Sequence, residues 1–359
     1  MGIPELSYFQ PRGAVDLFRR GVSECLQAGG AAWLAAFGIL LAPTVIAVAG
    51  QVAIAQTGAM ELMQAMQKGE VRPENLDAGE MFGAIALLVG VGVVTGLVSM
   101  LAQYGGGVAI ARMQAERALG RSLWAAAAWD FVLGRAAKVF SGALVMLLVI
   151  AGAAIAGQIP GGIVAAVLGM SSGPMQPGDT PPLIMRIAPM ATMLPVILAA
   201  SVYLVAMVGV TAVENFGGFP ALSRSFRLAG GRFWHVLGAI VLAGLAFTGP
   251  GMAVGMLAQS RIAEGLRESQ GAMVGTLIIA GGSSLLSLLL SPFMMSVQAA
   301  IYFDLRSRLR DERFTPYELA LDVGGELPAG VSPPPEETDW SPPPSDSSAS
   351  ALPPPPSTS

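Results

Sequence analysis

The chain has 359 residues, of which 53% are hydrophobic and only 12% are charged, and its formal net charge is −4. Soluble domains contain about 25% charged residues, so the surplus of apolar side chains indicates a protein that faces lipid. One cysteine and one histidine are too few for a disulfide scaffold or for a zinc, haem or iron–sulfur site. The acidic balance excludes the basic surface by which proteins bind nucleic acid. We therefore expect no cofactor and no nucleic-acid partner.

Six stretches are long and apolar enough to cross a bilayer, which takes about 20 helical residues. None contains Lys, Arg, Asp or Glu; they span approximately residues 31–56, 81–103, 139–158, 187–213, 233–258 and 272–303. The polar leader before the first stretch is too long for a cleaved signal peptide, so we expect that stretch to be a retained span. A shorter apolar stretch, residues 159–170, contains Pro160-Gly161-Gly162 and is predicted to be a re-entrant or interfacial extension of the third span.

Basic residues lie mostly on one side of these spans. Residues 1–30, the second-to-third and fourth-to-fifth linkers and the segment after the last span together hold 15 of the 20 Lys and Arg residues. Because positively charged loops stay on the cytoplasmic side of a membrane, both termini are predicted to be cytoplasmic. The chain then divides into an N-terminal segment (1–30), a membrane domain (31–303), a basic juxtamembrane segment (304–323) and a tail (324–359).

A weak internal repeat places an amphipathic helix before each pair of spans. Ala118–Ser122 resembles Ala221–Ser225, and Ala28–Gly30 resembles Ala229–Gly231. Apolar residues recur at helical spacing in these segments, with arginines on the opposite faces; the apolar residues are Val15, Phe18, Val22 and Cys25, then Leu119 and Leu123, then Leu222 and Phe226. We expect an all-α, polytopic membrane protein with six transmembrane helices, in three units of a cytoplasmic amphipathic helix plus a membrane hairpin. The amphipathic helices should lie in the plane of the lipid headgroups.

The tail, residues 324–359, contains 11 prolines, five acidic residues and no Lys or Arg. Such a composition cannot bury a core, so we expect it to be disordered. Its proline runs favour the polyproline II conformation that aromatic grooves recognise. The tail is therefore interpreted as a solvated tether, or alternatively as a docking peptide for a protein partner.

Charged residues and prolines near the spans bear on transport. No charged residue lies at the centre of a span, where coupled transporters usually place one. His235, beside Trp234 near the cytoplasmic interface, suits an aromatic belt better than a proton relay, and Glu214 and Arg186 are expected to reach water. Four prolines are candidate helix breaks that either kink packed helices or line a solute path: Pro43, Pro195, Pro250 and Pro292.

Enzyme signatures are absent from the sequence. It contains no Walker A loop, no Gly-x-Ser-x-Gly motif and no second histidine for acid–base work. We expect no enzymatic activity.

Three segments resemble the bacterial membrane domain of glycerophosphoryl diester phosphodiesterases. They are Arg12–Phe18, Glu214–Trp234 with its Ala221-Leu222-Ser223-Arg224-Ser225 run, and Tyr302–Arg308 at the end of the last span. The resemblance implies an integral protein of the bacterial inner membrane. The family's catalytic barrel has no counterpart here, because a single histidine cannot supply its phosphate site, so the resemblance implies no reaction.

The repeat segment Ala118–Ser122 and the last two of these segments supply candidate interface residues for lipid headgroups: Arg121, Arg224, Ser225, Arg227, Asp304 and Arg306. We expect Asp304 to pair with Arg224 and hold the third amphipathic helix beneath the bundle; independent solvation of both charges is the alternative. The sequence favours a non-enzymatic membrane scaffold or lipid-interacting protein, with membrane lipids as partners. A small-solute or lipid transporter, with its path where proline breaks face one another, is the alternative.

Overall fold

A computed structural model describes residues 6–36, 41, 45–46, 49–50, 78–171, 183–250, 253, 271–309 and 314–324, and these form helices and turns with no strand. In chain order they are η1 (Leu6–Phe9), α1 (Ala14–Ala28), α4 (Ala78–Ala118), α5 (Ala125–Gly134), α6 (Ala136–Ser171), α7 (Leu183–Leu204), α8 (Met207–Gly209), η3 (Val210–Glu214), α9 (Gly218–Ala229), α10 (Phe233–Ala243), η4 (Gly244–Thr248), α12 (Gly271–Ser307) and α13 (Pro316–Val323). The predicted all-α class is confirmed for this part of the chain.

Four helical segments are long and apolar enough to cross a membrane: Val89–Ala118, Ala136–Leu168, Ile187–Glu214 and Leu288–Ser307. A fifth candidate is the pair Gly218–Ala229 and Phe233–Phe247, which passes the same criteria together but is bent by 106° at its junction. By length and composition the described residues thus contain four to five candidate spans, as expected of a multi-pass membrane protein. Six spans are not confirmed, because most of the predicted first span, 31–56, lies outside the described residues.

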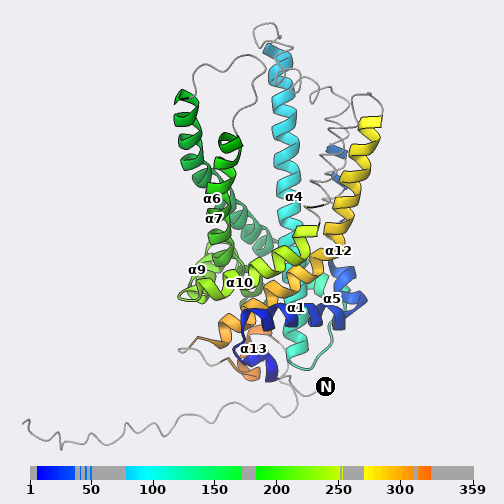
Figure 1. Cartoon of the computed structure of the whole chain (residues 1–359). Helices are drawn as coiled ribbons and strands as arrows, with labels where there is room; N and C mark the ends of the chain where they lie inside the picture. Colours follow the sequence, from blue (N-terminus) through cyan, green and yellow to red (C-terminus); the bar gives the residue numbers. More distant parts are fainter. Residues whose placement is uncertain are drawn as a thin grey trace, which may run out of the picture.

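The long helices α4, α6, α7 and α12 run alongside one another, and shorter helices gather around one end of them (Figure 1). We call α1, α5, α9, α10 and α13 the basal helices. α6 packs along α7, α1 packs against α12 and α10, and α13 contacts η3 and α4. The basal helices therefore join parts of the chain that are far apart in sequence.

The first basal helix, α1, buries a face that overlaps only in part with the one its apolar spacing predicts, because Cys25 of that set is buried but Val15 is not. Arg20 and Glu24 are buried, whereas Val15 is 60% exposed. The cause is the close approach of α1 to α12 at Gly21, where a Cβ atom would lie only 2.6 Å from the Cα atom of Val297. A glycine at the contact and ion pairs beneath it thus decide which face of α1 is covered.

The prediction of a second amphipathic helix is wrong. α4 continues to Ala118, and residues 119–124 form a turn before α5. Gly120 has a left-handed φ of 73°, and the N–H groups of Gly120 and Arg121 donate to the carbonyls of Arg117 and Glu116, an arrangement that ends helices. The third predicted amphipathic helix corresponds to α9. The three-unit repeat is not confirmed.

Helices continue through prolines that the sequence marks as breaks. α7 contains Pro195 and α12 contains Pro292 without ending at either, so both alternatives for these prolines, a kink in a packed helix or the lining of a solute path, stay predictions. α6 likewise continues through Pro160, so residues 159–170 extend the third span as a helix. In a packed membrane bundle, neighbouring helices and small local adjustments compensate for the hydrogen bond that proline removes. Pro250 follows the π-helical turn η4, and Pro43 lies outside the described residues.

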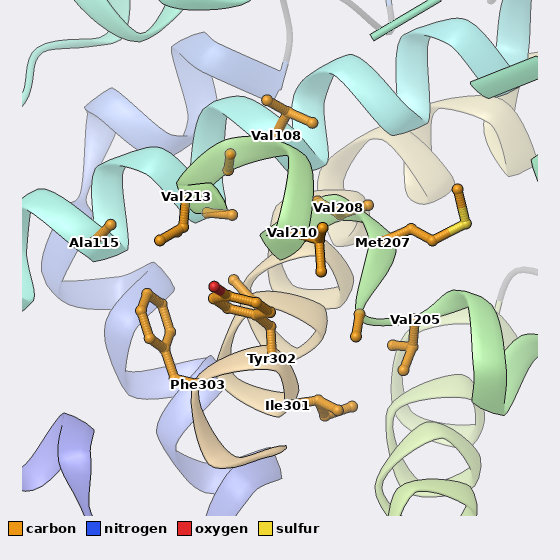
Figure 2. Packing of buried hydrophobic residues seen from close by; sticks show 14 of the residues in the cluster. Val108, Ala115, Val205, Met207, Val208, Val210, Val213, Ile301, Tyr302 and Phe303 are labelled. Atoms are coloured by element: carbon orange, nitrogen blue, oxygen red, sulfur yellow. The ribbon is translucent and has the colours of Figure 1, made fainter. Parts of the chain in front are cut away.

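Apolar side chains from α8, η3 and the C-terminal parts of the long helices α4 and α12 pack together in the core. Figure 2 shows Val108 and Ala115 of α4 facing the stretch 205–213 and Tyr302 of α12. Gly209 permits this packing, because a Cβ atom there would lie 2.1 Å from Cγ of the Tyr302 ring. The core fixes the end of α12, on which the polar residues described below are carried.

The predicted juxtamembrane segment, 304–323, begins inside α12 and ends with α13. The Thr315 hydroxyl accepts a hydrogen bond from the Glu318 N–H, and the Glu318 carboxylate accepts one from the Thr315 N–H. This capping box, with Pro316 in the first turn, starts the helix. Leu319 and Val323 are buried, so α13 belongs to the folded unit. The predicted disordered tail lies outside the described residues beyond Gly324.

Candidate functional site: buried ion pairs of the basal helices

Charged side chains are buried where the basal helices meet the long helices. Each of the following is less than 9% exposed: Arg20, Glu24, Glu116, Asp304 and Arg306. Removing an ion from water costs several kcal/mol unless a partner compensates. The partners of these ions therefore determine which helices are bound together.

Asp304 binds groups from three segments of the chain. Its side chain is 1% exposed, and its Oδ2 atom lies 2.9 Å from Nε2 of His235 and 2.8 Å from Nε of Arg308. Its Oδ1 atom accepts a hydrogen bond of 2.6 Å from the backbone N–H of Arg12. Asp304 thus ties the N-terminal segment and α10 to the end of α12.

The predicted pairing of Asp304 with Arg224 is wrong. Arg224 instead pairs with Glu214, at 2.6 Å between Nε and Oε2, while Asp304 is bound to His235 and Arg308. The bend between α9 and α10 places His235, not Arg224, beside α12. We call the buried charged groups between the basal helices and the long helices, together with their direct partners, the ionic layer. His235 is therefore part of this ionic layer and not only a member of an aromatic belt.

Glu214 is the centre of a second cluster. Its side chain is 7% exposed, which corrects the expectation that it reaches water. It accepts a hydrogen bond of 3.0 Å from the hydroxyl of Tyr302, and that hydroxyl accepts one of 2.9 Å from Arg306. Arg306 also pairs with Asp322 of α13. Glu214 and Arg306 thus connect η3, α9, α12 and α13.

Glu24 is the centre of a third cluster between α1 and α4. Its carboxylate lies 3.2 Å from Nη1 of Arg117 and 3.8 Å from Nη2 of Arg20. The Arg20 guanidinium stacks 3.5 Å above the ring of Tyr8. Burial, and secondarily the charge of Glu24, raises the pKa of the Tyr8 hydroxyl well above its usual value, so Tyr8 stays neutral beside the carboxylate.

Glu116 on α4 is shared by two arginines. Nη2 of Arg112 lies 2.8 Å from one carboxylate oxygen, and Nε of Arg121 lies 3.4 Å from the other. Arg112 also donates a hydrogen bond of 2.8 Å to the carbonyl of Val323. This contact ties the end of α13 to α4.

The six residues predicted to contact headgroups separate into three environments. Arg224, Asp304 and Arg306 have side chains no more than 10% exposed and form the ion pairs described above. Ser225 is buried and donates to the carbonyl of Tyr203. Arg227 is exposed on α9, and Arg121 is half-buried at the end of α4. Burial gives the first four the role of joining helices.

Sequence reasoning missed Glu24, Tyr8, Glu116 and Tyr302 as members of this layer. Two of them carried a readable signal: Arg20 precedes Glu24 and Arg112 precedes Glu116 by four residues, the spacing of ion pairs on one helix face. No local pattern marks the pairing of Glu24 with Arg117, because 93 residues separate them.

The only cysteine of the chain provides a test of how firmly α1 is packed. Cys25 is 1% exposed, and burial raises the pKa of its thiol to about 11. At pH 7.5 we expect alkylation by iodoacetamide at least about 100-fold slower than that of free cysteine, because the thiolate is the nucleophile. Denaturation in dodecyl sulfate should remove the difference. Mass spectrometry of labelled protein over time measures both rates; equal rates before and after denaturation would contradict the packing of α1.

Each described carboxylate at the centre of these clusters is bound to at least one guanidinium group, so the arrangement is suited to joining helices. In the part of the chain that the structure describes, no group of three or more His, Cys, Asp or Glu side chains is placed to hold a metal ion. No protein-family model, curated protein or solved structure matches the chain. The resemblance to the phosphodiesterase membrane domain therefore stays a prediction.

Proposed function

We propose that the chain is a non-enzymatic scaffold of the bacterial inner membrane whose basal helices contact membrane lipids on the cytoplasmic side. The observation that carries this proposal is the outward face of α9 and α10. Phe219 of α9 is 70% and Trp234 of α10 80% exposed, and Arg227 of α9 is also exposed. Aromatic and cationic side chains together are typical of helices at a membrane–water interface.

The inward face of α9 supports the same proposal. Ala221 and Leu228 are fully buried, and Arg224 is bound to Glu214. The helix therefore cannot turn its aromatic side chains inward without breaking a buried ion pair, which costs about 3–5 kcal/mol. Its apolar outward face gains free energy only if lipid or another protein covers it.

Depth-dependent fluorescence quenching tests this location. A variant that retains Trp234 as its single tryptophan is reconstituted in vesicles of brominated phosphatidylcholine, with bromine near the headgroup or near the chain end. We expect stronger quenching by the shallow bromine. A single-tryptophan variant that retains Trp33, which is only partly exposed and stacks edge-to-face on Phe293, is the comparison. Quenching of Trp234 by neither lipid would contradict the proposal.

The same vesicles separate a scaffold from a transporter. Protons, potassium ions or small organic anions are entrapped in the vesicles. We expect their efflux rate to equal that from protein-free vesicles. A variant that lacks residues 325–359 should behave alike, because the tail is proposed to be a tether. Efflux that depends on the protein would overturn the scaffold and favour transport.

A further inference from the structure

A cavity of about 470 Å³ opens between the C-terminal part of α1, the lower part of α4 and α12. Its polar lining comes from α1, the end of α4, the segment that follows it and α12, and includes Glu24, Gln114, Arg117, Arg121, Ser122 and Ser296. Its volume is within the range of about 300–1,000 Å³ typical of small-molecule sites. The ion pairs described above do not fill it.

The described cavity wall has one more positive than negative charge. Arg117 and Arg121 line it, with Glu24 as the only carboxylate among the described lining residues. Glu24 is bound to Arg117, and Glu116, which faces Arg121, is already bound to Arg112 at 2.8 Å. The Nε and Nη2 atoms of Arg121 are enclosed and make no hydrogen bond within the described residues. A single anionic group would balance this charge.

Further groups offer hydrogen bonds to a ligand. Gln114 is 5% exposed and donates to Ser296, but its Oε1 atom is enclosed without a hydrogen-bond partner in the described part of the chain. α5 begins at the cavity with Ala125, and its N-cap residue Trp124 makes no side-chain capping hydrogen bond. The first N–H groups of a helix have no partner within the helix and favour an anion. The wall therefore presents donors to an anion and an acceptor to a hydroxyl.

The rest of the lining is apolar and reaches the outer surface. Ala31, Ile110 and Met113 line the cavity. At its rim Leu34 is 66% and Trp124 78% exposed. A ligand with a polar head and long aliphatic chains fits both the charged interior and this rim.

We propose that this cavity binds the headgroup of an anionic phospholipid of the phosphatidylglycerol type. The phosphodiester lies against Arg121 and the N-terminus of α5, a headgroup hydroxyl donates to Oε1 of Gln114, and the acyl chains run over Leu34 and Trp124. A headgroup that adds an ammonium group is disfavoured beside two arginines. This site rests on the proposed function and deepens it by assigning one lipid class to one place.

Native mass spectrometry of the purified full chain in detergent tests the site. Titration with dihexanoyl phosphatidylglycerol should give one tightly bound molecule, and dihexanoyl phosphatidylcholine should bind at least tenfold more weakly. Arg121→Gln should weaken phosphatidylglycerol at least tenfold, and Arg121→Lys should restore part of the affinity. Arg19→Gln removes an equal charge from the exposed face of α1 and should change nothing.

Ser122 provides a variant that does not depend on a buried side chain. It is exposed at the cavity wall, so Ser122→Asp should fold and repel the anion, whereas Ser122→Ala should bind as the unmodified chain does. Inorganic phosphate is titrated in parallel. Displacement of the lipid by phosphate at equal concentration would show a simple anion site and overturn the lipid assignment.

Failure of the site and failure of the proposed function give different results. Equal lipid binding by Arg121→Gln, Ser122→Asp and the unmodified chain would overturn the cavity site, while shallow quenching of Trp234 would still support the scaffold. Loss of that quenching together with protein-dependent efflux would overturn the proposed function itself.

Discussion

Asp304→Asn is expected to lower the free energy of unfolding by about 3 kcal/mol. The substitution leaves His235 and Arg308 without the carboxylate that binds both of them at the end of α12. Removal of one partner from a buried ion pair costs about 3–5 kcal/mol. We expect the lower end because the side chains of His235 and Arg308 are 22% and 28% exposed.

This effect is measured by heating the protein in detergent and monitoring its unfolding by size-exclusion chromatography. A loss of about 3 kcal/mol corresponds to a melting temperature lower by about 6–12 °C. Asp130→Asn is the matched control, because Asp130 is exposed on α5 and should shift the melting temperature by less than about 2 °C. Equal shifts for both variants would contradict the structural role of Asp304.

Gly21→Ala is expected to displace α1 from α12. The added Cβ atom would lie 2.6 Å from Cα and 2.8 Å from N of Val297. These are backbone atoms of a long helix and cannot move aside as a flexible side chain does. Overpacking of this kind costs about 1–3 kcal/mol, and we expect the upper end.

Two measurements check this displacement. The melting temperature should fall, and iodoacetamide should alkylate Cys25 faster, because the thiol on the same helix loses its cover. Gly152→Ala on α6 is the control, since no atom of the described residues lies within 4 Å of a Cβ atom there. A stable Gly21→Ala protein with an unchanged labelling rate would show that α1 and α12 do not approach so closely.

The ionic layer connects these expectations. Asp304 and Glu214 each bind groups from at least two other segments, and Glu24 of α1 binds Arg117 of α4, so the basal helices are coupled to the long helices at several points. Buried ion pairs add less net stability than apolar packing would, because desolvation offsets much of the attraction. Their effect is on orientation: they fix which faces of α1 and α9 are exposed, and the exposed face of α9 carries proposed lipid contacts.

Composition and local pattern alone predicted that this protein is surrounded by lipid and that it is helical. Long uncharged apolar stretches favour lipid around them, and they predicted a helix within each of α4, α6, α7 and α12, although α4 continues beyond the predicted end at residue 103 to Ala118. The spacing of apolar residues also predicted helices at α1 and α9. These properties depend on neighbouring residues, which a sequence displays.

Only the tertiary structure decided the partners of the buried charges. The bend of 106° between α9 and α10 brings His235 to Asp304 and leaves Arg224 with Glu214, contrary to the pairing expected from sequence. Gly21 similarly decides that α1 buries Arg20 and Glu24. Coulomb attraction and close packing act between groups that meet in space, whatever their separation along the chain, so helix periodicity and composition carry no information about which of many arginines reaches a given carboxylate.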